Sequence, residues 1–394
     1  MDKEFKAKAD LFYGVLSQAR YGSIEVSYRK ELVFSHNGEF EGPKALVTLV
    51  NKKCLDDFFL KGDLGWAESY IEKNWESSNL SDFLEWGAKN FHEFSKYIRG
   101  KWFIILYLRM KHYLNGNSRS GSKKNISFHY DLGNSFYEKW LDESMTYSSA
   151  MFEKKTDDLF KAQINKYFNL AKITNIRNKD KVLEIGCGWG GFSEYLAKNY
   201  NVSIDCITIS KKQFEFTKKR ISDSGLNNKV NVLFLDYRDL RDKYDKIASI
   251  EMIEAVGENY LGKYFETIKK SLNENGSAAI QGITIRDDLF DRYRRSEDFI
   301  QKYIFPGGFL PSVNLMKTLI KRNNLNLTKV NSYPDDYAKT LASWRVNFFK
   351  AWDNITPLGF DETFKRMWEF YLSYCEAGFK SRNINLIQFS MSNK

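Results

Sequence analysis

Glycine residues are concentrated in one short segment, residues 186–191 (GCGWGG), which follows an apolar run and precedes a helical pattern. Glycine lets the backbone turn tightly and lets a ligand approach it closely. The spacing satisfies G-x-G-x-x-G, which marks nicotinamide dinucleotide sites when it lies between a strand and a helix. The segment therefore predicts a ligand-binding turn, and a nicotinamide-dependent dehydrogenase is one function that it allows.

The sequence around this turn argues against a dinucleotide. Such sites usually have an Asp or Glu at the end of the second strand, where the carboxylate binds the ribose. The corresponding strand here ends in Thr208-Ile209-Ser210. An acid, Glu184, instead precedes the glycines and gives E-x-G-x-G, which resembles motif one of S-adenosylmethionine-dependent methyltransferases. We therefore favour a methyltransferase over a dehydrogenase.

Two further polar residues, Asp236 and Tyr237, end the third strand of this region. An acid there can accept a hydrogen bond from an adenine amino group, and an aromatic ring can stack on the base. The same pair could equally be an aspartate that caps a loop and a half-buried tyrosine.

Strands and helices alternate around the glycine turn. This alternation predicts an α/β fold with a doubly wound sheet, whose ligands bind at the carboxyl ends of the strands where the strand order reverses. We expect strands at 181–188, 202–210, 230–236, 244–252 and 276–285, and helices at 191–200, 211–225 and 259–272.

The residues before the turn form a separate region with a different pattern. A strand pair is expected over 23–35 and 45–51, around the turn-like segment 36–43. Helical patterns follow at 55–62 and 66–75, and from Ser81 to about Tyr113. Residues 114–125 are small, polar and basic, which is typical of a linker or loop.

Composition narrows the classes of partner and the compartment. The 60 basic and 50 acidic residues give a net charge of +10, which suits an anionic partner and also solubility. No nucleic-acid-binding signature is present, so we expect no nucleic acid. The four cysteines are far apart, which predicts no metal site or disulfide framework and fits a cytoplasmic protein. No apolar run reaches the roughly 18 residues that span a bilayer.

Six segments in order resemble successive motifs of the cyclopropane-fatty-acyl-phospholipid synthases and their relatives, the mycolic acid cyclopropane synthases. They are residues 129–152, 182–192, 249–260, 299–312, 337–344 and 374–379. Residues 61–77 resemble, less specifically, the N-terminal lipid-binding domain of that family. The resemblance implies a Rossmann-like class I methyltransferase domain (126–394), a linker (114–125) and a smaller α+β lipid-binding domain (1–113).

The resemblance also implies which residues bind S-adenosylmethionine. They match a Tyr-Ser pair, the glycine turn and a T-x-S-x-x-Q segment that contacts the ribose. Together with the acids and the aromatic residue already described, the expected cofactor site comprises Tyr147, Ser148, Glu184, Gly186, Gly188, Thr208, Gln213, Asp236 and Tyr237.

The expected catalytic residues are Glu254 and Tyr337, which match members of a site that holds a bicarbonate ion in relatives and removes a proton after methyl transfer. Two departures lie in this pocket: Ser149 replaces the usual Cys, and Gln281 replaces the usual His. Both side chains can still donate hydrogen bonds to an anion. No histidine follows His129, so a histidine base or metal site in the α/β core is not expected.

The resemblance implies transfer of a one-carbon unit to the double bond of an unsaturated phospholipid. The position of the base decides between a cyclopropane and a methyl- or methylene-branched chain. Basic residues around an apolar stretch at 96–114 could dock on an anionic membrane surface or form a buried interdomain helix. We expect a cytoplasmic, peripherally membrane-associated enzyme and leave open a homodimer. A lipid-binding protein on a degenerate methyltransferase fold is the alternative from another class.

Overall fold

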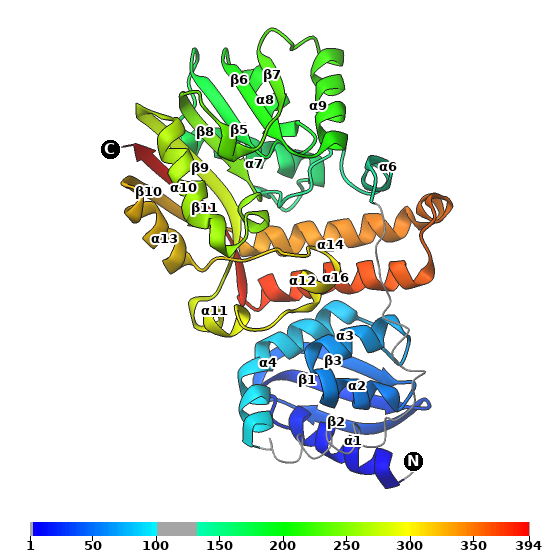
Figure 1. Ribbon diagram of the computed structural model, residues 1–394. Helices are drawn as coiled ribbons and strands as arrows, with labels where there is room; N and C mark the ends of the chain where they lie inside the picture. Colours follow the sequence, from blue (N-terminus) through cyan, green and yellow to red (C-terminus); the bar gives the residue numbers. More distant parts are fainter. Residues whose placement is uncertain (1–2, 101–131, 394) are drawn as a thin grey trace, which may run out of the picture. The chain divides into compact units, whose positions relative to one another are not determined.

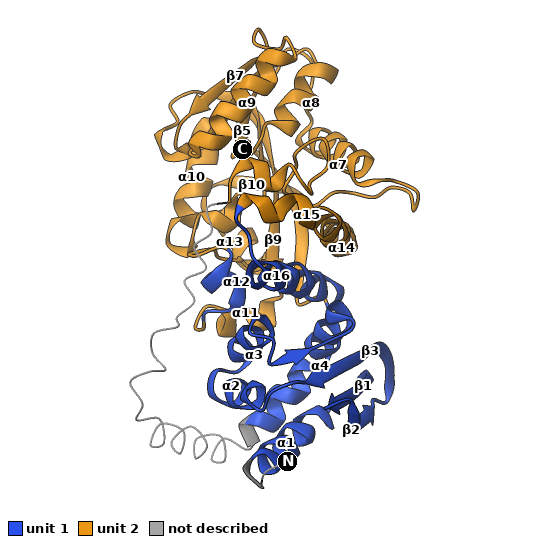
Figure 2. Ribbon diagram, turned by 90° about the vertical axis from the view of Figure 1, so that its right-hand side faces the viewer, with its two compact units in different colours: residues 1–130, 297–304, 359–381 blue, residues 131–296, 305–358, 382–394 orange. Residues whose placement is uncertain are grey.

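The computed structural model describes residues 3–100 and 132–393, and the chain divides into two compact units (Figure 2). Unit 1 comprises residues 1–130, 297–304 and 359–381, and unit 2 comprises residues 131–296, 305–358 and 382–394. Two segments from late in the chain therefore group with the N-terminal residues. The expected linker at 114–125 lies outside the described residues, and the expected domain limits stay a prediction.

The sheet of unit 1 has the strand order β2-β1-β3-β4. Its strands are β1 (Tyr21–Tyr28), β2 (Glu31–Asn37), β3 (Phe40–Leu49) and β4 (Trp75–Glu76). The prediction of one strand over 23–35 was wrong, because the chain reverses at Arg29 and Lys30, both with positive φ. Tight hairpin turns of this kind favour Gly, Asn or Asp, so the sequence carried no turn signal here.

The helices of unit 1 surround a core rich in tryptophan. They are α1 (Lys3–Leu16), α2 (Lys53–Lys61), α3 (Asp63–Ile71), α4 (Leu80–Gly100), α12 (Phe299–Tyr303) and α16 (Glu362–Lys380). The rings of Trp66 and Trp75 stack with centroids 4.5 Å apart. Helix α16 packs against α3 and α4, and the Arg366 guanidinium lies 3.9 Å from the ring centroid of Tyr70. The helix expected to continue to Tyr113 is described as far as Gly100.

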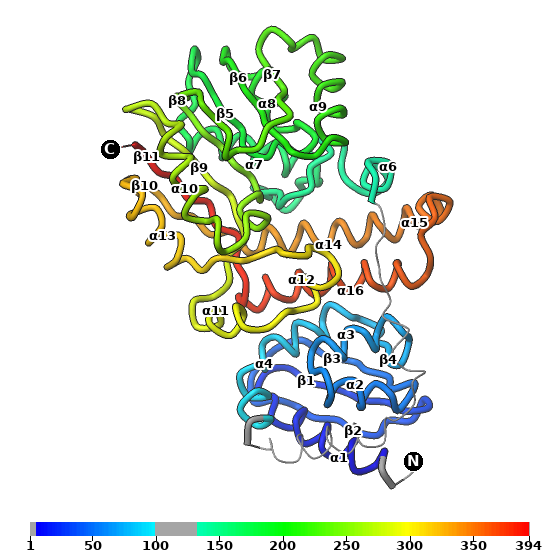
Figure 3. Tube along the Cα trace, in the orientation of Figure 1, coloured from blue at the N-terminus to red at the C-terminus, as the bar shows by residue number. Residues whose placement is uncertain are grey.

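The sheet of unit 2 has the order β10-β11-β9-β8-β5-β6-β7 (Figure 1). Its strands are β5 (Lys181–Ile185), β6 (Ser203–Thr208), β7 (Val230–Phe234), β8 (Tyr244–Ile250), β9 (Leu272–Ile285), β10 (Leu325–Ser332) and β11 (Ile384–Asn393). The neighbouring strands β7, β6, β5, β8 and β9 are parallel to one another. Strand β11 is antiparallel to both β9 and β10. Along the chain, β6 and β7 follow β5 on one side of it, and β8 then pairs with the other side of β5. The strand order therefore reverses between β5 and β8 (Figure 3).

Helices cover both faces of this sheet. The longer ones are α7 (Leu159–Thr174), α8 (Gly191–Asn199), α9 (Lys211–Asp223), α10 (Leu261–Ser271), α13 (Val313–Arg322) and α14 (Pro334–Lys350). The shorter ones are α6 (Asn134–Tyr137), α11 (Asp287–Tyr293), α15 (Trp352–Ile355), η2 (Tyr237–Asp239), η3 (Ile253–Ala255), η4 (Glu258–Tyr260) and η5 (Thr356–Leu358). The prediction of a doubly wound sheet is confirmed.

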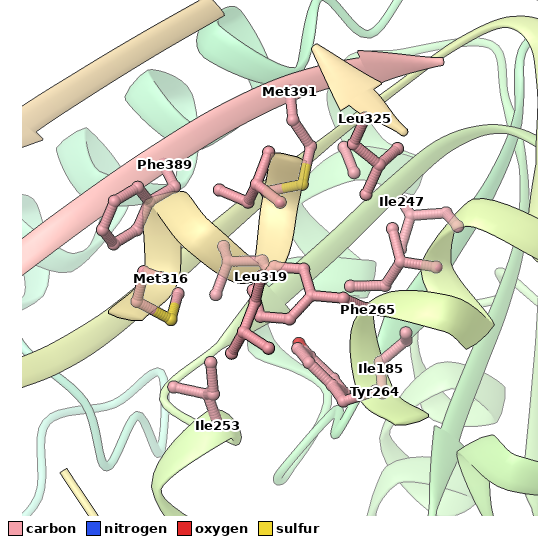
Figure 4. Packing of buried hydrophobic residues seen from close by; sticks show 14 of the residues in the cluster. Ile185, Ile247, Ile253, Tyr264, Phe265, Met316, Leu319, Leu325, Phe389 and Met391 are labelled. Carbon is pink, nitrogen blue, oxygen red and sulfur yellow. The ribbon is translucent and has the colours of Figure 1, made fainter. Parts of the chain in front are cut away.

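Side chains along each strand alternate between the two faces of the sheet, and they form a separate hydrophobic core on each face. Leu183 and Ile185 of β5 pack with α10 and α13 in one cluster, part of which Figure 4 shows. Val182 of the same strand faces the other cluster, with α7, α8 and α9. Successive side chains of a strand point to opposite faces, so a strand covered on both sides reads as a continuous apolar run. Within the described parts of the chain, no helix is long and apolar enough to cross a membrane.

Candidate active site

A cavity of about 510 Å³ opens where β5, β6, β7 and β8 end, which is the edge of the sheet at which the strand order reverses. Ligands of open α/β sheets bind at this edge. The structure brings together here all of the residues expected from the sequence to bind the cofactor. The residues lining the cavity include Tyr147, Ser148, Glu184, Gly186, Gly188, Thr208, Gln213, Asp236 and Tyr237.

The glycine turn after β5 shows why its residue type matters at two positions. Gly188 has a φ of +53°, and a Cβ atom built there would meet no atom within 4 Å. Gly186 has a φ of +80°, and its Cβ atom would lie 2.8 Å from Cγ of Met252. The amide groups of Gly186 and Cys187 both donate to the carbonyl of Ile207 on β6. Because Gly188 has no side chain, the space beside its Cα remains part of the cavity.

Two buried ionisable residues, Glu184 on β5 and Lys166 on α7, lie near the glycine turn. Glu184 accepts a hydrogen bond from Ser193 Oγ, and burial raises the pKa of its carboxyl to about 8. Lys166 is buried on α7 and donates to Ser148 Oγ over 2.7 Å. Burial lowers the pKa of Lys166 to about 7, while the charge of Glu251 is the strongest influence in the opposite direction. Glu184 therefore lines the cavity, and Lys166 lies behind the lining residue Ser148, each with a pKa close to neutrality.

The ends of β6 and β7 place polar groups at the cavity. Thr208 Oγ1 donates to Gln213 Oε1 over 3.0 Å and accepts from the backbone of Ser210. Asp236 caps η2 and accepts hydrogen bonds from Arg238, whose side chain lowers the pKa of the aspartate. The ring of Tyr237 meets that of Tyr264 edge-on at 5.5 Å. The loop-capping role considered for Asp236 is thus present, and the residue also lines the cavity.

Tyr147 and Trp189 form an aromatic wall of the cavity, and further rings pack around Tyr147. The ring centroid of Tyr147 lies 5.1 Å from Tyr137, 5.2 Å from Trp344 and 5.8 Å from Trp140. Tyr137 in turn lies 5.0 Å from Trp189, which is part of the glycine turn. Aromatic faces attract cations electrostatically and offer no strong nucleophile. This wall is suited to a ligand or reaction intermediate that carries positive charge.

Three of the four expected catalytic residues, Ser149, Gln281 and Tyr337, converge on Glu251, which was not among the residues expected from the sequence. Glu251 follows β8 and lines the cavity. Its Oε1 atom accepts from the Ser149 amide over 2.8 Å and from Gln281 Nε2 over 2.9 Å. Its Oε2 atom accepts from the hydroxyl of Tyr337. An acidic residue directly after the fourth parallel strand was the signal that could have revealed it.

The two residues that depart from the family pattern behave differently from one another. Gln281 donates through its side chain, as expected, and its Oε1 atom accepts from Gln388 Nε2 over 2.9 Å. Gln388 in turn accepts from the partly buried Asn169 over 2.7 Å, so a chain of side-chain amides fixes the orientation of the Gln281 amide. Ser149 contributes its backbone N–H, while its hydroxyl donates to the carbonyl of Ala150. The Ser149 hydroxyl is thus bound to the backbone of Ala150, and its expected contact with an anion stays a prediction.

Glu254 lies one turn further along, in η3, and the residues that line the cavity do not include it. Its Oε1 atom accepts from the Ile283 amide, and its buried Oε2 atom has no hydrogen-bond partner among the described residues. Burial, with a further contribution from the charge of Glu251, raises the pKa of Glu254 to about 8. Glu254 is therefore largely protonated at neutral pH.

The residues of the cavity fit S-adenosylmethionine but do not fit bicarbonate. The open glycine wall, the polar ends of β6 and β7 and the aromatic wall suit a cationic nucleoside. An anion near Tyr337 would find the three donors already bound to Glu251, and it would meet the negative charge of that carboxylate. Two negative charges that lie side by side in a buried site repel each other strongly. Of the described residues, no group of three or more His, Cys, Asp or Glu side chains could hold a metal ion.

Comparisons with known proteins agree with a site for S-adenosylmethionine. Residues 117–389 match the family described as mycolic acid cyclopropane synthetase. The chain is 35% identical over 352 residues to the tuberculostearic acid methyltransferase UfaA1 of Mycobacterium tuberculosis, covering 84% of this chain and 79% of that protein. It is 34% identical over 349 residues to the cyclopropane-fatty-acyl-phospholipid synthase of Escherichia coli (strain K12), covering 85% and 86%. The solved structure of mycolic acid cyclopropane synthase CmaA1, complexed with SAH and CTAB, is similar with a TM-score of 0.63 at 28% identity, covering 67% of this chain and 95% of that one.

Proposed function

The chain belongs to the mycolic acid cyclopropane synthetase family and is an S-adenosylmethionine-dependent methyltransferase, and we propose that it adds a one-carbon unit to the double bond of an unsaturated phospholipid acyl chain. The dehydrogenase alternative is wrong for this family. The observation that carries the proposal is that the glycine turn and the Glu251 carboxylate line one and the same cavity.

The residues of the cavity would hold the cofactor through the space at Gly188, polar groups at the end of β6 and the ring of Tyr147. Bound S-adenosylmethionine supplies an electrophilic methyl group on a sulfonium. Gly188 leaves space for the ligand, and Thr208 and Gln213 offer hydroxyl and amide groups at the end of β6. Tyr147 lies in the aromatic wall, where its ring can face positive charge. Holding both reactants in line is the main contribution expected of these groups.

The chemistry of an alkene requires a proton acceptor at the same site. When the π electrons form a bond to the incoming carbon, the neighbouring alkene carbon becomes a cation. Loss of a proton from the new methyl group closes a cyclopropane, whereas loss from a neighbouring carbon gives a branched chain with a double bond. The names of the relatives do not choose between products, since a methyltransferase and a cyclopropane synthase are 35% and 34% identical to the chain.

The membrane is the proposed source of the substrate. The net charge of +10 favours an anionic lipid surface. The basic and apolar stretch at 96–114 that suggested docking is described only up to Gly100, and the rest lies outside the described residues. Peripheral association with the cytoplasmic face of a membrane, and a homodimer, stay predictions.

Lipid mass spectrometry tests the proposed function. Purified protein is incubated with vesicles of unsaturated phospholipid and methyl-labelled S-adenosylmethionine, and we expect the acyl chains to gain one labelled carbon. A protein that binds the cofactor or the lipid and leaves the chains unmodified would support the alternative, a lipid-binding protein on a degenerate methyltransferase fold.

A further inference from the structure

The donors around Glu251 are arranged as an anion site that is filled by a side chain. We propose that the Glu251 carboxylate is itself the proton acceptor of the reaction, so that the enzyme needs no bicarbonate. This inference rests on the proposed function and adds to it the identity of the base.

The location of Glu251 satisfies the first requirement of a base, which is access to the reacting atoms. The residue keeps partial exposure and lines the cavity together with its neighbours Ile250 and Met252. The strand before it, β8, pairs with β5, and the Ile185–Ser249 pair ends that ladder directly before the glycine turn. A ligand held by the turn is therefore next to this carboxylate.

The hydrogen bonds satisfy the second requirement, which is an oriented carboxylate with a free lone pair. A carboxylate has two oxygens with about four lone-pair sites. Oε1 accepts two hydrogen bonds, from Ser149 N and Gln281 Nε2, and Oε2 accepts one, from Tyr337. Among the described residues, this arrangement leaves one site on Oε2 for a proton from the substrate.

The neighbouring charges satisfy the third requirement, which is that Glu251 and not Glu254 is the ionised member of the pair. Hydrogen bonds to a carboxylate stabilise its charged form. Glu251 accepts three such bonds, whereas Glu254 accepts one, from Ile283, and its Oε2 atom has none among the described residues. Burial raises the pKa of Glu251, while these hydrogen bonds and the buried amine of Lys166 act in the opposite direction and favour its charged form. The proton of the pair therefore resides on Glu254.

The step balances without a further reactant. The carbon–sulfur bond breaks as the alkene electrons form the new carbon–carbon bond, and Glu251 Oε2 then takes a proton either from the new methyl group or from a carbon next to the cation. The electrons of that carbon–hydrogen bond close the ring or form a double bond. The open cavity lets the protonated carboxyl return its proton to solvent before the next turnover.

Two variants and removal of bicarbonate test the proposal. In carbonate-free buffer the unmodified enzyme should form product at the same rate as with added bicarbonate. Glu251→Gln keeps the size of the side chain, so the binding of S-adenosylhomocysteine should persist while turnover falls about 100- to 10,000-fold, the usual contribution of a general base. Glu266→Gln, an exposed carboxylate on α10, is the matched control and should leave turnover unchanged.

Glu251→Gly separates a chemical role from a structural one. The backbone of Glu251 has a φ of +48°, which glycine adopts readily. The variant frees the three donors, so bicarbonate should restore part of its activity. The proposal is overturned if the unmodified enzyme loses turnover without bicarbonate, or if Glu251→Gln keeps full turnover. If the unmodified enzyme makes no product in either buffer, the proposed function itself fails, and the role of Glu251 fails with it.

Discussion

The hydroxyl of Tyr337 on α14 donates a hydrogen bond to Oε2 of Glu251 at the end of β8, although the two residues are 86 positions apart in the chain. Burial and the charge of Glu251 both raise the pKa of Tyr337 well above its usual value. The phenol therefore remains protonated and remains a donor throughout the pH range in which the enzyme would work.

Tyr337→Phe removes this donor and little else. A hydrogen bond to a charged group contributes about 1.5 to 3 kcal/mol, so we expect kcat to fall about tenfold or more while the affinity for S-adenosylhomocysteine changes little. Steady-state kinetics with calorimetry would measure both. Tyr200→Phe, at the end of α8, is the control. Unchanged kcat in the Tyr337 variant would remove this residue from the catalytic arrangement.

Gly188→Ala should abolish or strongly weaken binding of S-adenosylhomocysteine, because the added methyl group would project into the cavity. Gly225→Ala is a close control: Gly225 also has positive φ, at +66°, and its Cβ atom also meets no atom within 4 Å. Both changes strain the backbone similarly, but only Gly188 lines the cavity. Equal calorimetric affinities of the two variants would contradict the assignment of the glycine turn.

Glu254→Gln should change the pH dependence of stability. The folded-state pKa of Glu254 is raised from 4.5 to about 8, so the group contributes stability that is fully present below 4.5 and is lost as pH rises through about 8. Because glutamine imitates the protonated acid, the variant should lose less stability than the unmodified protein over this range. Denaturant unfolding across the range measures the difference, and identical pH profiles would show that Glu254 ionises normally.

Glu251→Asp should alter the ratio of products. The shorter side chain withdraws the carboxylate by about 1.5 Å, the length of one carbon–carbon bond, and a displaced acceptor reaches a different proton of the same cation. Proton NMR separates cyclopropane protons, which resonate upfield, from those of branched chains. The same ratio at reduced rate would mean that the position of Glu251 does not choose the product.

The parallel strands and the glycine turn could be predicted because local patterns specify them. Alternating strands and helices, and glycines between a strand and a helix, are features of adjacent residues. The site of Glu251 is different, because its three donors lie 102, 30 and 86 positions away and meet only in the folded chain. The sequence identifies Glu251 as an acidic residue, but it does not reveal which hydrogen-bond donors surround the carboxylate in the folded chain.

Errors elsewhere have similar causes. The hairpin at Arg29 and Lys30 has none of the residues that favour such turns. Strands β10 and β11 had no expectation from the sequence, and their antiparallel pairing beyond β9 joins segments far apart in the chain. Long-range pairing of this kind is determined by packing over the whole sheet and is not evident from a local window.

In the proposed reaction, a sulfonium methyl group is transferred to an acyl chain and Glu251 acts as the base. The most direct measurement follows labelled carbon from S-adenosylmethionine into unsaturated phospholipid, in carbonate-free buffer, for the unmodified enzyme and for Glu251→Gln. We predict labelled acyl chains from the unmodified enzyme, and from the variant a yield lower by about 100-fold or more. Equal labelling by the two proteins, or labelling that depends on added bicarbonate in the unmodified enzyme, would show that Glu251 is not the base.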